Sequence, residues 1–349
     1  MKTLFIEGDQ GKYPVIIGEG VIQTLPQYIT TDHVLIVTDE NVKTYHLDTL
    51  KSVVKEKNVS VFTLSHQPEQ NKNLRTFEKL INFALQNNFP RSGLVLAFGG
   101  GAVGDFAGFF ASTFMRGVDY IQLPTSILAH DSSVGGKVAL NHYGIKNIIG
   151  SFYSPKAVIY DLSFLSTLPK EEVLSGFGEL IKHDLLSDGT LIKRLESIKS
   201  IDEVSTEYLE SLFVNAVRTK ARYIKDDFYD ELKTRKYLNL GHTLGHAIES
   251  EYGIKHGIAI LYGICFDWYL SRKVEAINYY HLFKRLGFFE SIPQLDPEQL
   301  LLRMVHDKKN KDSNNLHFIS LEKIGKPFSI YLTHNEFRTI FNQFITEVE

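Results

Sequence analysis

A glycine-rich segment directly after an apolar run most constrains how this chain can fold. Residues 93–101 read GLVLAFGGG, and the chain continues as AVGDFAGFFAS, whose small and apolar residues favour a helix. Gly99, Gly101 and Gly104 satisfy the pattern G-x-G-x-x-G, which lets backbone N–H groups approach a pyrophosphate at a helix N-terminus. The same glycines would also suit a tight turn with no ligand. In its strand–turn–helix context, the segment predicts a nucleotide-binding turn in a parallel sheet.

The rest of the first half repeats this alternation of strand and helix. Apolar runs that end in turn residues cover 33–39, 120–126 and 156–162, and residues 73–88 have apolar side chains at helical spacing. Continuous apolar runs separated by helices are typical of a parallel sheet that is covered on both faces.

The second half has a different periodicity. From about Leu168 the pattern is helical, except for a possible hairpin over 316–333. We therefore predict an α/β protein with two domains. Residues 1–166 form an N-terminal Rossmann-like α/β domain, and residues 167–349 form a C-terminal mostly α-helical domain.

Composition excludes several classes of protein. The net charge is −3 without a long basic run, so neither nucleic acid nor an anionic membrane surface is an expected partner. No stretch of 18 apolar residues exists, and the N-terminus lacks the apolar core of a signal peptide. Cys265 is the single cysteine, so no internal disulfide can form. We expect a cytoplasmic protein.

The segment NLGHTLGHAIESEYGIKHG contains three histidines at metal-ligand spacing. His242 and His246 are four residues apart and would share one helix face, and His256 follows a short connection. The three could bind a metal together, or two of them could do so with a carboxylate. A solvated or buried pair without a metal fits the spacing equally well.

An upstream carboxylate candidate is Glu179 in GFGELIKHD. Lys182 and His183 would share its helix face. From the residues alone, these three side chains are better explained as an exposed charged face.

Two further features concern a nucleotide and an anion. Asp39 ends the run 33–39, where an acidic residue can accept a hydrogen bond from a ribose hydroxyl. Asp119 is less well placed for this role, because it precedes its strand. The segment 116–150 combines many small residues with isolated charges, as binding loops and exposed loops both do. Its charged and amide side chains include Arg116, Asp131, Lys137, Lys146 and Asn147.

Taken in order, these motifs resemble 3-dehydroquinate synthase, the second enzyme of the shikimate pathway, which leads to chorismate and the aromatic amino acids. The stretches that carry the resemblance are GGGAVGDFAGFFASTFMRG, PTSILAHDSSVGGK, KNIIGSFYSPKAVIYD, TLPKEEVLSGFGELIKH, RKYLNLGHTLGHAIE and DKKN. They extend from about residue 35 to residue 325.

The resemblance implies two cofactors, NAD and a Zn²⁺ or Co²⁺ ion. The metal ligands would be Glu179, His242 and His256. The positions matching NAD contacts are Asp39, Glu69, Lys72, Gly100, Gly101, Ala102, Asp105, Thr125, Ser126, Lys137, Lys146 and Thr167.

The resemblance also implies a sugar-phosphate substrate and a homodimer. The residues matching phosphate contacts are Lys137, Asn147, Lys182 and His246, with Arg116 donated by the partner subunit and Asp131 beside the metal and the sugar hydroxyls. The substrate carboxylate would meet Lys220, Arg235, Asn239 and a lysine of the DKK stretch, Lys308 or Lys309.

The implied activity is that of a lyase, which converts 3-deoxy-D-arabino-heptulosonate 7-phosphate into 3-dehydroquinate and phosphate. The chain departs from the family pattern at HQPE before Lys72, at Ser126, in a shorter LAHDSS loop and by one extra residue between Lys220 and Arg235. Three alternatives are another sugar-phosphate cyclase, of the 2-deoxy-scyllo-inosose or valiolone type, an NAD- and metal-dependent alcohol dehydrogenase, and a nucleotide-sensing module. The last would leave the His and Glu residues unexplained.

Overall fold

The protein is represented by a computed structural model, which describes residues 1–349 except 226, 228, 230–233, 291 and 306–314. Lys308 and Lys309, predicted carboxylate contacts, lie outside the described residues. The chain forms two compact units, Met1–Pro169 and Lys170–Glu349. The domain boundary after residue 166 stays a prediction.

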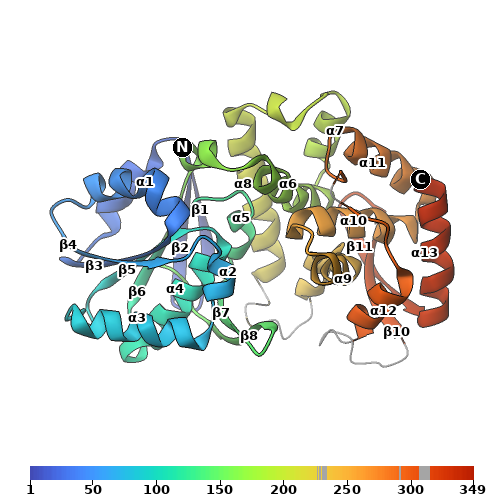
Figure 1. The fold of residues 1–349 in the computed structure, drawn as a ribbon. Coiled ribbons are helices and arrows are strands. Elements are labelled where there is room, and N and C mark those ends of the chain that lie inside the picture. The colour runs from blue at the N-terminus through green and yellow to red at the C-terminus, as the bar shows by residue number, and fades with distance from the viewer. Residues whose placement is uncertain (226, 228, 230–233, 291, 306–314) are drawn as a thin grey trace. The chain divides into compact units, whose positions relative to one another are not determined.

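The first unit is built on a seven-stranded sheet in the order β1-β2-β9-β6-β5-β3-β4 (Figure 1). Only the β1–β2 pair is antiparallel, and the other neighbours run parallel. The strands are β1 Lys2–Gly8, β2 Gly11–Gly18, β3 His33–Asp39, β4 Asn58–Leu64, β5 Leu94–Gly99, β6 Asp119–Pro124 and β9 Ala157–Asp161. The expected parallel sheet is thus confirmed.

Helices cover both faces of this sheet. Alternate residues of a strand point to opposite faces. Leu35 and Val37 of β3 accordingly pack with α3 and α4, whereas Val34 and Ile36 pack with η1 and α1. The helical segments are η1 Val21–Tyr28, α1 Glu40–Val53, α2 Pro68–Asn71, α3 Leu74–Gln86, α4 Gly101–Thr113, η2 Phe114–Arg116, α5 Ala129–Ser132 and η3 Leu162–Thr167. A separate antiparallel hairpin joins β7 Lys137–His142 to β8 Ile145–Phe152.

The second unit is mostly helical, as predicted. Its helices are α6 Lys170–Leu185, α7 Thr190–Glu196, η4 Ile201–Glu203, α8 Thr206–Ile224, η5 Thr234–Asn239, α9 His242–Tyr252, α10 His256–Tyr269, α11 Lys273–Arg285, α12 Pro297–Val305 and α13 His334–Val348. The hairpin expected over 316–333 is confirmed as β10 Asn315–Lys323 paired with β11 Lys326–Thr333.

Helix α10 is the centre of this unit. It is apolar on nearly every side, and every residue from Gly257 to Tyr269 is buried. Such a helix must be surrounded by other elements, and α10 contacts α6, α9 and α11. Among the described residues, no helix has both the length and the apolar character needed to cross a bilayer.

Candidate active site

The glycine-rich turn has the strand–turn–helix form that its sequence predicted. Strand β5 ends at Gly99, and α4 begins at Gly101 with Gly100 as its N-cap. A Cβ at Gly101 would lie 2.8 Å from the Ser132 Oγ, so a larger residue would crowd the turn. The turn therefore keeps backbone N–H groups accessible at the start of a buried helix.

Predicted cofactor residues gather at the carboxyl ends of neighbouring strands. Asp39 ends β3, Gly99 ends β5, and the Thr125 N–H follows β6 and donates to the Gly99 carbonyl at 3.1 Å. Ligands bind at this edge in open parallel sheets. The Asp39 Oδ1 accepts from the N–H groups of Asn41 and Val42, at 2.9 and 3.1 Å. Burial raises the pKa of the Asp39 carboxyl, although these two bonds oppose the rise.

A polar network joins two groups of predicted residues in the first unit. The side chain of Lys72 is only 2% exposed, and its Nζ lies 2.7 Å from the Asp105 Oδ2 and 3.8 Å from a Glu69 oxygen. It also donates to the Asn147 Oδ1 at 2.5 Å. Asn147 was predicted to contact phosphate and the other three to contact NAD, so the structure places both sets in one network.

Asn141 also belongs to this network, although no sequence motif indicated it. Its Nδ2 donates to the Glu69 Oε1 at 2.8 Å, and its Oδ1 accepts from the backbone N–H of Asn147 at 2.8 Å. Asn147 has a φ of 52°, an unfavourable backbone conformation that this bond helps to hold. The link to Glu69 spans 72 positions, which no local pattern reveals.

The other predicted residues of the first unit lie on several different elements. Lys137 begins β7, and its Nζ lies 5.8 Å from the centroid of the Phe152 ring. Arg116 is exposed at the end of η2 with a φ of 68°. The hydroxyl of Thr167 lies 2.8 Å from the His46 Nε2. The remaining positions are Ala102 in α4, Ser126 after β6, Asp131 in α5 and Lys146 in β8.

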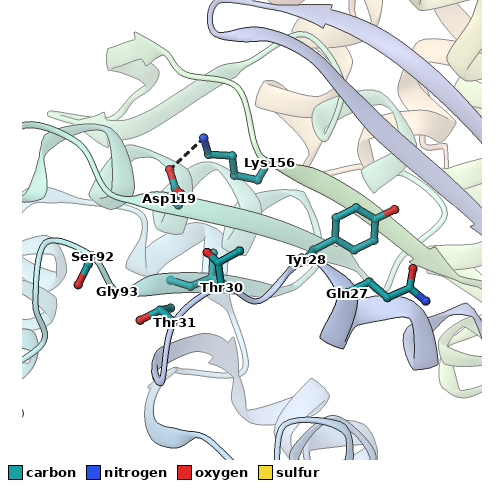
Figure 2. A pocket seen from close by; sticks show the side chains of 9 residues that line it. Gln27, Tyr28, Thr30, Thr31, Ser92, Gly93, Asp119 and Lys156 are labelled. Carbon is teal, nitrogen blue, oxygen red and sulfur yellow. Dashed lines mark ion pairs between the residues drawn. The ribbon is translucent and has the colours of Figure 1, made fainter.

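A cavity of about 430 Å³ lies at the opposite end of the same sheet, where its parallel strands begin (Figure 2). Its lining includes Thr31, Gly93 and Asp119, which lie just before or at the starts of β3, β5 and β6. Asp119 forms an ion pair with Lys156 at 3.4 Å. The cavity is therefore separate from the carboxyl ends of the strands, where the glycine-rich turn lies.

In the second unit, a carboxylate and histidines converge on one point. The Oε1 atom of Glu179 lies 3.4 Å from the His256 Nε2 and 3.6 Å from the His242 Nε2. Ring nitrogens of His242, His246 and His256 lie within 4.8 Å of one another. These donors fit a cation such as Zn²⁺ or Co²⁺, which accepts imidazole and carboxylate ligands.

Backbone contact between two helices sets the spacing of this cluster. A Cβ at Gly178 of α6 would collide with the carbonyl of Gly257 in α10. A Cβ at Gly257 would in turn collide with the carbonyl of Ser175, whose hydroxyl accepts from the Gly257 N–H at 3.0 Å. Glu179 and His256 are the chain neighbours of these glycines, so the close approach brings their side chains together.

The expectation of an exposed charged face on α6 is wrong. Glu179 and Lys182 are each 1% exposed and His183 is fully buried. Helix α6 contacts both α8 and α10, so this face is covered. The Lys182 Nζ lies 2.5 Å from the Glu179 Oε2, which allows both charges to be buried.

The two histidines beside Glu179 are oriented by different groups. The His256 Nδ1 lies 2.7 Å from the Glu249 Oε2, and the His242 Nδ1 lies 3.0 Å from the Leu240 carbonyl. Burial lowers the pKa of His256, but hydrogen bonds to Glu179 and Glu249 outweigh it and raise that pKa to about 9. Burial and the nearby Lys182 hold the pKa of His242 well below its usual value. Glu249 could not be predicted from local sequence, because its partner, His256, lies beyond the end of its own helix.

Residues predicted to bind the substrate carboxylate come from two helices of the second unit. Lys220 of α8 and Arg235 of η5 are 8% and 6% exposed. The Arg235 N–H donates to the Asp227 Oδ2 at 3.5 Å. Asn239 ends η5, just before the turn that leads into His242.

Comparison with known proteins first defines the class. A solved structure of 2-deoxy-scyllo-inosose synthase, complexed with carbaglucose-6-phosphate, NAD+ and Co2+, matches this fold with a TM-score of 0.87. The match covers 98% of this chain and 99% of that chain at 26% identity. Together with the sequence matches below, this defines the chain as a cyclase enzyme.

The family follows from sequence. Residues 62–175 match the 3-dehydroquinate synthase N-terminal domain, and residues 176–310 match its C-terminal domain. The 3-dehydroquinate synthase of Bacillus pumilus is 40% identical over 339 residues, which cover 93% of each chain. That of Oceanobacillus iheyensis is 37% identical and covers 100% of this chain and 99% of its own length. The chain belongs to the 3-dehydroquinate synthase family, and the resemblance seen in the sequence is confirmed.

Proposed function

We propose that this chain catalyses the 3-dehydroquinate synthase reaction, in which 3-deoxy-D-arabino-heptulosonate 7-phosphate becomes 3-dehydroquinate and phosphate. The observation that most directly supports this proposal is the convergence of Glu179, His242 and His256 within a chain of this family. Because phosphate leaves by elimination, the enzyme is a carbon–oxygen lyase.

The metal ligands in this proposal are Glu179, His242 and His256. Three protein ligands leave a coordination position for substrate, as catalytic sites require. The ion pair with Lys182 uses the Oε2 of Glu179, and the Oε1 faces the histidines. One carboxylate can therefore bind a cation and a buried lysine with different oxygens.

NAD would bind at the carboxyl ends of the parallel strands in the first unit's sheet. Gly100 and Gly101 present backbone N–H groups, and Asp39 offers a carboxylate at the end of β3. The other residues proposed to contact NAD are Glu69, Lys72, Ala102, Asp105, Thr125, Ser126, Lys137, Lys146 and Thr167. When bound, the nicotinamide would supply reversible hydride transfer at the substrate C5, and the cation would polarise the oxygen at that carbon.

The chain's own side chains would hold the two anionic ends of the substrate. Lysines and amides stabilise a departing phosphate through charge-assisted hydrogen bonds. The proposed phosphate contacts are Lys137, Asn147, Lys182 and His246, with Arg116 from the partner subunit of a homodimer and Asp131 at the sugar hydroxyls. The guanidinium of Arg235 can grip a carboxylate with two parallel bonds. Lys220, Asn239 and a lysine of the DKK stretch, Lys308 or Lys309, complete the proposed carboxylate site. We propose a cytoplasmic location, which the single cysteine supports.

Product identification tests this function. The protein, Zn²⁺, a trace of NAD⁺ and the heptulosonate phosphate should yield 3-dehydroquinate and one phosphate per turnover, with no accumulation of NADH. Accumulation of NADH in step with product would indicate a dehydrogenase. Efficient cyclisation of glucose 6-phosphate or sedoheptulose 7-phosphate, which lack the carboxylate, would indicate another sugar-phosphate cyclase.

A further inference from the structure

One peptide group, between Leu240 and Gly241, connects His242 to a buried acid on another helix. The Leu240 carbonyl lies 3.0 Å from the His242 Nδ1, and the Gly241 N–H donates to the Asp267 Oδ2 at 2.7 Å. A carbonyl oxygen can only accept, so the His242 Nδ1 carries the proton. The Nε2 atom then presents its lone pair on the side where Glu179 lies, 3.6 Å away.

Asp267 is an unusual residue for its position. It lies in α10, among apolar side chains, and is 0% exposed. Burying a carboxyl group is costly unless it is hydrogen-bonded, and among the described residues its Oδ1 has no hydrogen-bond partner. Burial raises the pKa of Asp267 well above its usual range, and its Oδ2 accepts from the Gly241 N–H. The bond from the Gly241 N–H is thus the one hydrogen bond to this carboxyl among the described residues.

The turn that contains this peptide has little freedom to move. Gly241 has a φ of 79°, and a Cβ there would lie 2.5 Å from the Ile260 carbonyl of α10. A Cβ at Gly263 would collide with the carbonyl of Gly241. The start of α9 is therefore pressed against α10, where Asp267 can hold its peptide in one orientation.

We propose that Asp267 is a positioning residue for the metal site, acting through the Leu240–Gly241 peptide on the orientation and tautomer of His242. When the Gly241 N–H donates to Asp267, the Leu240–Gly241 peptide becomes polarised. The Leu240 carbonyl is then a stronger acceptor for the His242 Nδ1–H. Partners of the second ring nitrogen commonly tune metal-binding histidines. Here the partner acts through an intervening peptide, whereas His256 contacts Glu249 directly. This inference rests on the proposed metal function of His242.

Zinc affinity, measured by competition with a chelating indicator, tests the inference without relying on activity. Asp267→Leu keeps the branched shape of the side chain but removes the acceptor, and we expect about a tenfold weaker Kd, the lower end for outer-shell partners. Asp267→Asn keeps a side-chain oxygen that can accept from the Gly241 N–H, and should stay within about threefold of wild type. Ser320→Ala is the matched control, because the Ser320 hydroxyl donates to the backbone carbonyl of Asp267 and not to its carboxyl.

The outcomes separate this inference from the metal site itself. If His242→Ala binds zinc as tightly as wild type, the proposed ligand set is wrong. If His242→Ala loses zinc while Asp267→Leu retains wild-type affinity, only the role of Asp267 is refuted. A loss in Ser320→Ala equal to that in Asp267→Leu would also refute it, because general damage to α10 would then explain both.

A measurement on the wild-type protein does not depend on the folding of any variant at Asp267. Nitrogen NMR of labelled histidine, with His242 assigned by its absence from His242→Ala, should show the Nδ1–H tautomer. The Nε2–H tautomer would overturn the proposal even if Asp267→Leu fails to fold.

Discussion

The polar clusters of the two units differ in how their charged groups are paired. In the first unit, the ammonium of Lys72 is matched by Asp105, by Glu69 and by an amide oxygen. In the second, the Glu179 Oε1 lies 3.6 Å from the His242 Nε2 and 3.4 Å from the His256 Nε2, and the ammonium of Lys182 pairs with the other oxygen of Glu179. The first arrangement is a framework that is balanced within the protein. The second gathers a carboxylate and two imidazoles that can bind one cation after a proton leaves, so metal and pH should act mainly on the second unit.

Removing a metal ligand should give the largest effect. We expect Glu179→Gln to lower zinc affinity by more than the roughly 10–100-fold typical of outer-shell losses, because a direct anionic ligand disappears. Activity without added metal should fall with it. Glu172→Gln changes a partly exposed α6 residue that pairs with Lys255 at 2.7 Å, and this control should behave as wild type. The metal content of each purified variant tests this prediction. An unchanged content in Glu179→Gln would contradict the proposed ligand set.

Loss of the carboxylate behind His256 should be the next largest effect. Glu249→Gln keeps the size of the side chain but removes the charge that faces the His256 Nδ1 at 2.7 Å. Zinc affinity should fall by about 10–100-fold. Glu251→Gln, on the same helix but paired with Arg303, should leave the affinity unchanged. Equal losses in both variants would point to damage of α9 and not to His256.

Acid should weaken metal binding through His256. Its pKa is raised to about 9, and only the neutral imidazole can bind a cation, so zinc must displace a proton at any lower pH. We expect affinity to fall about tenfold per pH unit as pH drops below 9, with one proton released per zinc. Calorimetry in buffers of different ionisation enthalpy counts that proton. In Glu249→Gln the fall should begin at a lower pH, and an unshifted profile would assign the proton to another group.

The smallest effect should come from the first unit. Asn141→Ala removes the bonds to Glu69 and to the Asn147 N–H, and we expect the KM for NAD to rise about fivefold, equivalent to about 1 kcal/mol. Zinc affinity should not change. Tyr143→Ala, at the 92% exposed tip of the same hairpin, serves as control. A change in zinc affinity with no change in KM would reverse the contrast between the two clusters.

Local pattern predicted those parts of the structure that local chemistry determines. The turn after β5, the helical second half and the β10–β11 hairpin all follow from periodicity and turn residues within short windows. The burial of Glu179 and Lys182 did not, because charges at helical spacing normally face solvent and only the packing of α8 and α10 shows otherwise. Asn141 and Asp267 also escaped prediction. Their partners lie 72 and 26 positions away, and nothing in the neighbouring sequence encodes those contacts.

The contact between Gly178 and Gly257 has a consequence for how this site would tolerate sequence change. Neither residue carries a functional group, yet even one added methyl at either position would force α6 and α10 apart. A survey that searches for essential acids, bases and ligands would overlook both. A designer who transplants the site to another scaffold must therefore copy two empty positions as faithfully as the three side chains beside them.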